Sequence, residues 1–153
     1  MITRGRTPRL SARHERSIYV VLILAYVSGI AWMGLHYGVN RGVGLEDKWR
    51  IAENWLLKSH GAAAMAALIA FGSMLPIHVP SAWNLKRNLA SGLGMFTTLI
   101  VLAATGWLLY YASGETARAW SGYVHMAAGF FGPLILLWHL TCPKRLGRKD
   151  RRP

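Results

Sequence analysis

The sequence predicts an all-α integral membrane protein, a four-helix bundle with up-down-up-down connectivity. Apolar residues make up 53% of the 153-residue chain and charged residues only 16%. The charges are clustered, and four long runs contain no Asp, Glu, Lys or Arg: 17–40, 59–85, 88–114 and 119–143. About 20 helical residues, rising 1.5 Å each, cross the roughly 30 Å hydrocarbon core of a bilayer. Each run is therefore long enough to span a membrane.

The net charge of +12 lies mainly at the chain ends and in one connection. A soluble nucleic-acid-binding domain spreads Lys and Arg over its faces, so uncharged runs of this length exclude nucleic acid as the expected partner. Thirteen Lys and Arg lie in residues 1–17, 79–91 and 142–153, against five in the other two connections. By the positive-inside rule both termini should be cytoplasmic, with basic tails at 1–16 and 143–153 that also attract anionic lipid.

The first half of the chain should contain one span and the longest connection. At 153 residues the chain is expected to be a single membrane domain. A first span at about 17–37 is too long for a signal peptide. Residues 39–58 follow, with apolar side chains near helical spacing and charges between them. This pattern predicts an amphipathic periplasmic loop lying on the membrane surface, or equally the start of a long second helix.

The remaining spans are predicted at about 59–77, 89–111 and 120–140. The second is rich in Gly and Ala, and Pro76 and Pro80 lie at its exit. The fourth contains a proline, which neighbouring helices tolerate by satisfying the carbonyl that it frees. Because the connections between the last three spans are short, sequential helices should be antiparallel neighbours.

Five of the six histidines lie within or at the edges of these spans: His36, His60, His78, His125 and His139. An ionisable side chain in hydrocarbon must pair, ligate or line water, so it suggests a functional site. In the predicted bundle, spans two and four run parallel. His60 and His125 then share the periplasmic level, and His78 and His139 share the cytoplasmic level.

The spacing of these histidines is close to what two levels require. His125 and His139 are 14 residues apart, or about 21 Å, whereas His60 and His78 are 18 apart, or about 27 Å. Bending or unwinding at the two prolines near His78 would reduce the mismatch of about 6 Å.

Two histidines that face each other at one depth are the axial ligands of a b-type haem. The sequence therefore predicts two haems b, with His60 and His125 as iron ligands of one and His78 and His139 of the other. The neighbouring glycines and alanines leave room for a flat macrocycle, although such residues are also typical of close helix packing. A zinc or non-haem iron site would need three or four converging ligands, and the spans contain no carboxylate.

Several motifs carry a family resemblance across about residues 18–142. They are HGAAAM from His60, HVPSAW from His78, RNLASG from Arg87, TGWLLYY from Thr105, and the pattern His125 to Gly129 to His139. With the 14-residue histidine spacing in the last span, the chain resembles the bacterial four-helix di-haem cytochrome b superfamily. That superfamily includes the membrane subunits of formate dehydrogenases and nickel-iron hydrogenases. The motifs are most similar to an uncharacterised cytochrome-b-like group within it.

The resemblance implies one haem between the second and fourth helices and another between the start of the first helix and the end of the fourth. It agrees with His60 and His125 as one ligand pair and with His139 as a ligand. For the partner of His139 the two arguments differ. The resemblance points to His14, whereas the bundle geometry favours His78.

Three further residues are candidates for cofactor contacts. His36 competes with His60 on the periplasmic side; the alternative is an interfacial histidine bonded to water, a quinone or a haem propionate. Arg118 outside and Arg87 inside lie at suitable depths to pair with propionates, but for each one alone a snorkelling or topology role is the favoured explanation.

These features predict electron transfer across the bacterial inner membrane, between the quinone pool and a periplasmic cytochrome c or oxidoreductase subunit. At 17.0 kDa, an electron-transfer subunit of an oxidoreductase is expected rather than a stand-alone enzyme. The oligomeric state, homo- or hetero-, is left open. The alternative is a haem-free membrane protein, either a scaffold or a histidine proton relay, although a relay usually includes Asp or Glu within the spans.

Overall fold

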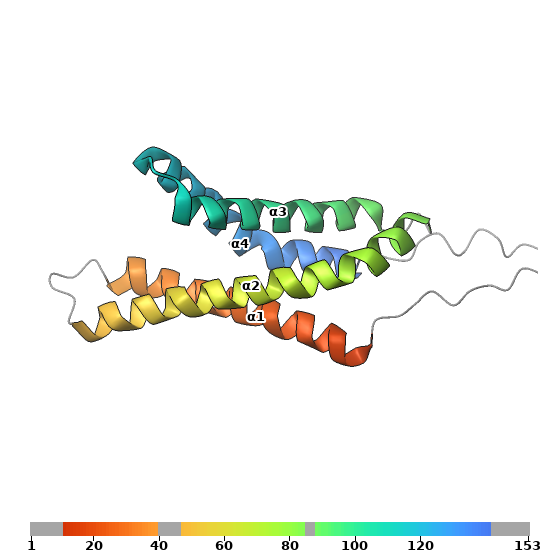
Figure 1. The fold of residues 1–153 in the computed structure, drawn as a ribbon, viewed down its shortest axis with the longest axis horizontal. Helices are drawn as coiled ribbons and strands as arrows, with labels where there is room; N and C mark the ends of the chain where they lie inside the picture. The colour runs from red at the N-terminus through yellow and green to blue at the C-terminus, as the bar shows by residue number, and fades with distance from the viewer. Residues whose placement is uncertain (1–10, 40–46, 85–87, 142–153) are drawn as a thin grey trace, which may run out of the picture. The chain divides into compact units, whose positions relative to one another are not determined.

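The computed structural model describes residues 11–39, 47–84 and 88–141, and all regular structure in these ranges is helical. The helices are α1 (Ala12–Gly34), α2 (Asp47–Asn84), α3 (Leu89–Tyr111) and α4 (Glu115–Thr141), and a π-helical turn, η1 (Leu35–Val39), extends α1 (Figure 1). Each of the four α-helices is long and apolar enough to cross a membrane. The prediction of an all-helical chain with four helices of spanning length is confirmed.

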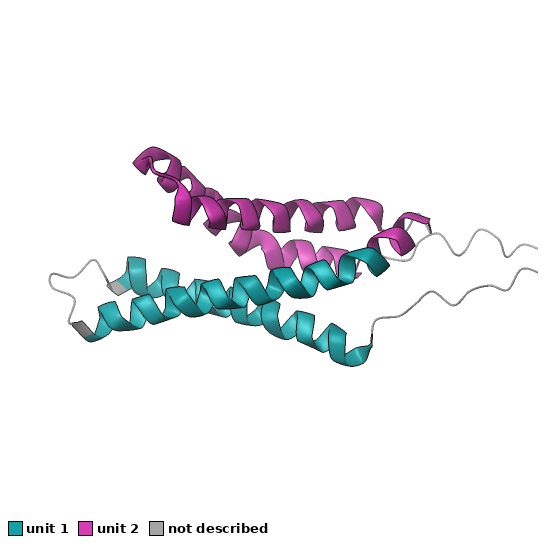
Figure 2. Cartoon of the chain, in the orientation of Figure 1, with its two compact units in different colours: residues 1–78 teal, residues 79–153 magenta. Residues whose placement is uncertain are grey.

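The chain divides into two compact units, residues 1–78 and 79–153 (Figure 2). In the first unit, α1 and α2 are antiparallel: His14, near the start of α1, contacts Ser73 late in α2, and His36 contacts Glu53 early in α2. In the second unit, α3 and α4 are antiparallel, because Ser91 contacts His139 and Thr105 contacts His125. Each unit is thus built around a helical hairpin.

Local signals explain where the helices begin. Ser11 is extended and its hydroxyl accepts a hydrogen bond from the backbone N–H of His14, which caps α1. Glu115 lies in the first turn of α4, where a negative charge favours the helix dipole. Consequently α1 and α4 each begin five residues before the predicted spans, whereas α3 has the predicted limits of 89–111.

The long helix α2 differs most from the expected boundaries. Residues 47–58, predicted as part of a periplasmic loop or as the start of a long helix, are its first three turns. No glycine or proline interrupts them, so the chain stays helical up to the apolar run. At the other end, α2 also continues through Pro76 and Pro80 to Asn84. The unwinding considered for the end that carries His78 does not occur.

Burial in this fold is opposite to that of a soluble protein. Among the described residues no apolar side chain is buried, and the four buried side chains are the hydroxyls of Ser91, Thr98, Thr105 and Ser121. All four belong to α3 or α4. Helices that pack within lipid bring small and hydroxyl residues together and turn their large apolar side chains outward. The apolar exterior therefore agrees with the predicted spans.

Candidate functional site

A ladder of hydroxyl groups on α3 faces histidines on α4. The hydroxyl residues recur at every seventh position of α3, and two histidines with a glycine midway between them recur at every seventh position of α4. Because the helices are antiparallel, equal spacing keeps both sets in register along the contact. The facing pairs are Ser91 with His139, Thr98 with Gly132 and Thr105 with His125.

The hydrogen bonds of Thr105 fix the tautomer of His125. The Thr105 hydroxyl donates its proton to the backbone carbonyl of Val101, with an oxygen-to-oxygen distance of 2.6 Å. Its Oγ1 lies 2.9 Å from Nδ1 of His125, which must therefore supply the proton of this second bond. A neutral His125 then carries its proton on Nδ1 and its lone pair on Nε2.

His139 has the same arrangement at the other end of the ladder. The Ser91 hydroxyl donates to the carbonyl of Asn88 at 3.2 Å, and Nδ1 of His139 lies 3.1 Å from the same hydroxyl oxygen. Ser91 is only 1% exposed, so this bond is shielded from competing water. Nδ1 of His139 is thus held against a buried hydroxyl oxygen of α3.

In the first unit, His60 bonds to the α1 backbone. Its Nδ1 lies 2.9 Å from the carbonyl oxygen of Ala25 and 3.2 Å from the hydroxyl of Ser28. Since a carbonyl can only accept, Nδ1 carries the proton. The lone pair of His60 therefore also lies on Nε2, and the tautomer is set more firmly than for the two histidines of α4.

A glycine follows each hydroxyl residue that contacts a histidine, and the glycine lies beside the imidazole ring. A Cβ added to Gly29 would lie 3.0 Å from Cε1 of His60, closer than most real contacts permit. A Cβ added to Gly106 would lie 3.4 Å from Cε1 of His125, and one added to Gly92 would lie 3.6 Å from Cε1 of His139. A hydroxyl residue followed by glycine thus recurs beside the imidazoles at 28–29, 91–92 and 105–106, and at Gly29 the ring is too close for a Cβ to fit without movement.

His14 and His78 differ in depth and in surroundings. His14 is 14 residues before Ser28, so it lies about 21 Å along α1 from the level of His60. This equals the separation of His125 and His139. Nε2 of His14 lies 3.1 Å from the Ser73 hydroxyl, which donates to Ala70. His78 is exposed and lies about 27 Å along α2 from His60.

His36 lies beyond the level of His60. Its Nδ1 contacts the carboxylate of Glu53 at 2.5 Å, and Glu53 is seven residues before His60 on α2. Two helical turns, about 10 Å, therefore separate the His36 level from the His60 level. The two histidines occupy different depths of the α1–α2 hairpin.

Of the two candidate arginines, only Arg118 is described, and Arg87 lies outside the described residues. Nη2 of Arg118 donates to the carbonyl of Ala112 at 3.0 Å, which satisfies the end of α3. Arg118 is two turns before His125, on the same face of α4. Its guanidinium has further donors for an anionic group at this end of the hairpin.

The histidines of each hairpin lie singly, each held by a hydrogen-bond partner on the neighbouring helix. In the described part of the chain, no group of three or more His, Cys, Asp or Glu lies together, whereas a haem iron needs only two axial ligands. An imidazole that ligates a metal through Nε2 typically donates its Nδ1–H to a carbonyl or hydroxyl oxygen. His60 meets this condition through the Ala25 carbonyl, and His125 and His139 each place Nδ1 against a hydroxyl oxygen of α3. The residues therefore fit a b-type haem.

Sequence reasoning identified the histidines but missed the groups that hold them. The usable signal was the seven-residue repeat of Ser91, Thr98 and Thr105, opposite the seven-residue repeat in α4. The contacts of His60 with Ser28 and the Ala25 carbonyl had no such signal, because any residue type can supply a backbone carbonyl. Which carbonyl lies opposite His60 depends on the register between α1 and α2.

Comparison of the chain with protein-family models, with curated proteins and with solved structures finds no match.

Proposed function

We propose that the chain is a di-haem b-type cytochrome that carries electrons across a membrane. The single observation that carries this proposal is the shared state of His60, His125 and His139. Each places Nδ1 within hydrogen-bond distance of an oxygen on the neighbouring helix, and His60 must donate there because the Ala25 carbonyl can only accept. The resemblance to the four-helix cytochrome b superfamily, based on the motifs around the same histidines, supports the same function.

In this proposal His60 and His125 hold one haem, and His139 and His14 hold the other. The depth of His14 supports its choice over His78, because the separations of about 21 Å along α1 and along α4 agree. Ligation through Nε2 of His14 requires breaking its bond to the exposed Ser73. A single hydrogen bond of this kind costs only about 0.5–1.5 kcal/mol net.

The haems would supply one-electron transfer at two depths, and the protein residues set the conditions for it. The Nδ1–H bonds fix the ring orientations and increase the basicity of the ligating nitrogen. Gly29 lets the His60 ring approach α1 closely, because an added Cβ would lie 3.0 Å from the ring. Arg118 lies where it can neutralise a propionate at the outer end of α4.

The proposed location is the bacterial inner membrane, with four spans and both termini in the cytoplasm. The length and apolar character of the four helices and the Lys and Arg bias of the flanking segments support it. In this orientation the first turns of α2 are periplasmic. Quinone is the proposed partner within the membrane, and a cytochrome c or an oxidoreductase subunit is the proposed partner outside.

The deciding experiment is a dithionite-reduced minus oxidised absorption spectrum of the detergent-purified chain, with pyridine haemochrome quantification. A b-type spectrum with about two haems per chain is expected from two bis-histidine levels. One haem would limit the proposal to the His60 and His125 level.

Absence of haem in protein made by haem-sufficient cells would favour the alternative, a haem-free proton relay or scaffold. The His36 and Glu53 pair is the observation that supports a relay, since it joins two groups that exchange protons.

A further inference from the structure

The two helical hairpins differ in the length over which both of their helices are uncharged, which we call the uncharged belt. In the second unit, the contact between Thr105 and His125 sets the register of the helices. It places α3 residues 89–111 opposite α4 residues 119–141, and none of these residues is charged. The belt is therefore about 34 Å long, which covers the roughly 30 Å hydrocarbon core of a bilayer.

The α1–α2 hairpin has a much shorter uncharged belt. The contact of Ser28 with His60 sets its register, and the contact between the far ends of the two helices agrees with it to within one residue. In this register the longest continuous belt is formed by residues 17–29 of α1 opposite residues 59–71 of α2. It is only about 20 Å long. The uncharged runs of the two helices are thus staggered, although each run alone is long enough to span a bilayer.

Lys58 ends this belt on the side of the first turns of α2, and its side chain is exposed. Three large exposed side chains of α2 lie on the same helix face as Lys58, at spacings of three, seven and four residues. They are Trp55, Met65 and Ile69, which are 64%, 65% and 73% exposed. A charge on such an apolar face is costly in hydrocarbon, so the Lys58 ammonium must reach the boundary of the bilayer.

The Lys58 side chain is directed away from the belt. Its Nζ lies 5.2 Å from the ring centroid of Trp55, which is almost one turn nearer to the start of α2. Trp55 is five residues before His60, and Trp32 is four residues after Ser28, so the two tryptophans lie at nearly the same level of the hairpin. Tryptophans and outstretched lysines are typical of the boundary between hydrocarbon and head groups. Three side chains on two helices therefore mark one boundary level.

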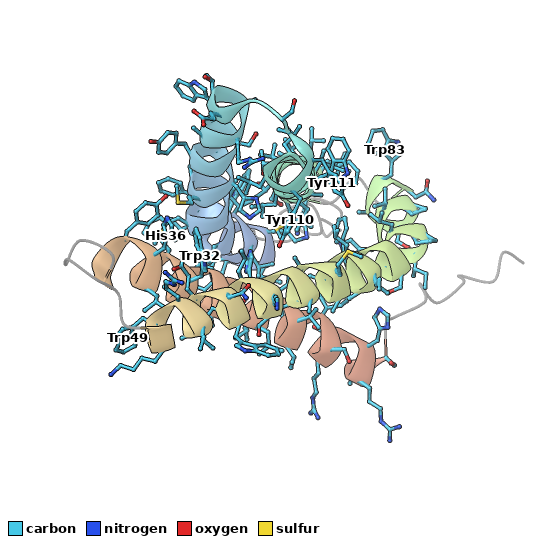
Figure 3. All side chains as sticks on the ribbon, turned by 60° about the vertical axis from the view of Figure 1, so that its left-hand side comes forward. Trp32, His36, Trp49, Trp83, Tyr110 and Tyr111 are labelled. Atoms are coloured by element: carbon cyan, nitrogen blue, oxygen red, sulfur yellow. The ribbon has the colours of Figure 1, made fainter. Side chains whose placement is uncertain are left out.

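The part of the hairpin beyond this level is held together by side-chain contacts. His36 in η1 stacks on Trp32, with ring centroids 4.6 Å apart, and contacts the carboxylate of Glu53 on α2. Figure 3 shows Trp32 and His36 at the same end of the hairpin as Trp49, near the start of α2. Although η1 belongs to an uncharged run, it thus lies beside charged turns of α2.

We propose that Lys58 and Trp55 anchor phospholipid head groups at the level of Trp32, and that this contact sets how deeply the α1–α2 hairpin sits in the bilayer. The charge identifies the lipid group, because an exposed ammonium complements an anionic phosphate. The turn η1 and the first turns of α2 then project beyond the hydrocarbon. The level of His60 lies only about 6 Å inside the head groups, close to a partner in water. This inference rests on the membrane location in the proposed function but not on the haems.

The proposed contact places the middle of the hydrocarbon layer away from the middle of the first uncharged run. Arg16 bounds the belt at its other end, and Ile23 lies midway between the levels of Arg16 and Lys58. The middle of the run 17–40 is about five residues further along α1. A layer of about 30 Å centred at Ile23 ends close to the level of Trp32. The charges of α2 thus set the depth of α1.

Labelling of single cysteines with N-ethylmaleimide tests this depth. Val20, Val27 and Gly34 are exposed, lie seven residues apart on one face of α1, and all belong to the uncharged run. Each is replaced by cysteine in the full-length Cys142→Ser chain, reconstituted in dioleoylphosphatidylcholine vesicles. A thiol reacts as the thiolate, which forms in water and not in hydrocarbon. Gly34→Cys should therefore react at least about tenfold faster than Val20→Cys or Val27→Cys.

A second substitution tests the role of Lys58. Lys58→Met keeps an unbranched apolar side chain but removes the ammonium, so the hydrocarbon layer can extend further along the hairpin. Labelling of Gly34→Cys should then slow at least about threefold. Lys48→Met is the matched control, because Lys48 also lies over a tryptophan ring, that of Trp49 at 5.8 Å, but is ten residues nearer to the start of the chain. It should leave the labelling rate unchanged.

The outcomes distinguish this inference from the proposed function. Slow labelling of all three cysteines, with full labelling after unfolding in detergent, would overturn the proposed boundary and leave the membrane location intact. Equally rapid labelling of all three would overturn both, because α1 would not span the bilayer. An unchanged rate for Gly34→Cys in the Lys58→Met chain would overturn the role of Lys58. Absence of haem would overturn the proposed electron transfer without affecting any of these rates.

Discussion

Thr105 accepts a hydrogen bond from His125 across the α3–α4 contact while it donates its own proton to the backbone of its helix. The nitrogen-to-oxygen distance is 2.9 Å, and Thr105 is buried. Because the hydroxyl donates to Val101, its oxygen is left as an acceptor. A buried threonine is common in membrane helices, and here its hydroxyl oxygen favours the tautomer of His125 that is protonated on Nδ1.

Replacing Thr105 by valine should weaken haem binding at the His60 and His125 level. The change keeps the shape of the side chain but leaves the Nδ1–H of His125 without its acceptor. Loss of such a partner typically costs about 10–100-fold in metal-site affinity. We expect haem per chain to fall from about two toward one, measured by pyridine haemochrome, and the remaining haem to keep its spectrum.

Thr98→Val is the matched control for this experiment. Thr98 is buried to the same extent in the same helix, but its hydroxyl donates to Gly94 within the helix, and its methyl group lies beside Gly132 where Thr105 has a histidine. Thr105→Ser, which retains the hydroxyl, should restore most of the haem. Equal haem loss in the valine variants at 98 and 105 would indicate a packing defect and contradict the tautomer argument.

Gly29→Ala should disturb His60 directly. The new Cβ would lie 3.0 Å from Cε1 of the ring, so the ring or the helix must move. Overpacking of this kind typically costs about 1–3 kcal/mol and would displace the imidazole from its bond to Ala25. We expect loss of about one haem per chain, read from the reduced-minus-oxidised spectrum.

Gly34→Ala provides the comparison on the same helix. A Cβ at Gly34 has nothing within 4 Å, so haem content and thermal stability should match the wild type. Two haems per chain in Gly29→Ala would show that haem binding does not depend on the position that the His60 ring has here.

The number and kind of helices followed directly from the sequence, because uncharged, apolar runs longer than twenty residues are typical of membrane-spanning helices. The limits of α2 did not follow from it. The segment 47–58 has the spacing of an amphipathic helix whether it lies on a surface or continues a span, and only the helix as a whole decides between them. Likewise, prolines at 76 and 80 permit a break in the helix but do not require one.

For the candidate site, the sequence identified the imidazoles but not their hydrogen bonds. The 14-residue spacing in α4 is visible in one helix, whereas the bond between His60 and the Ala25 carbonyl depends on how two helices are aligned. The choice between His14 and His78 likewise needed the register of α1 against α2. Ser28 of α1 contacts His60 of α2, so the distance of His14 from Ser28 along α1 gives the depth of His14 relative to His60.

The ligand pairing predicts opposite results for two histidine variants. His14→Ala should remove one haem, because it deletes the proposed partner of His139. His78→Ala should retain both haems, since His78 is exposed and about 6 Å too far along α2 to match the spacing in α4. Both variants are measured by haem per chain, with His139→Ala as the reference for loss of the same haem. Haem loss in His78→Ala with full haem in His14→Ala would reverse the assignment.

The proposed orientation places the first turns of α2 in the periplasm, and labelling of single cysteines tests it. Asn54 is exposed on α2 between the charged residues Glu53 and Lys58. In a Cys142→Ser background, Asn54→Cys should react with a membrane-impermeant maleimide added to intact spheroplasts. The native Cys142 in otherwise unchanged protein should react only after the membrane is opened, because thirteen Lys and Arg favour the cytoplasm for that side. Labelling of both positions from outside would contradict four spans, because residues 54 and 142 would then lie on one side. That result would also contradict the proposed electron transfer across the membrane, because His60 and His139 would not lie near opposite surfaces.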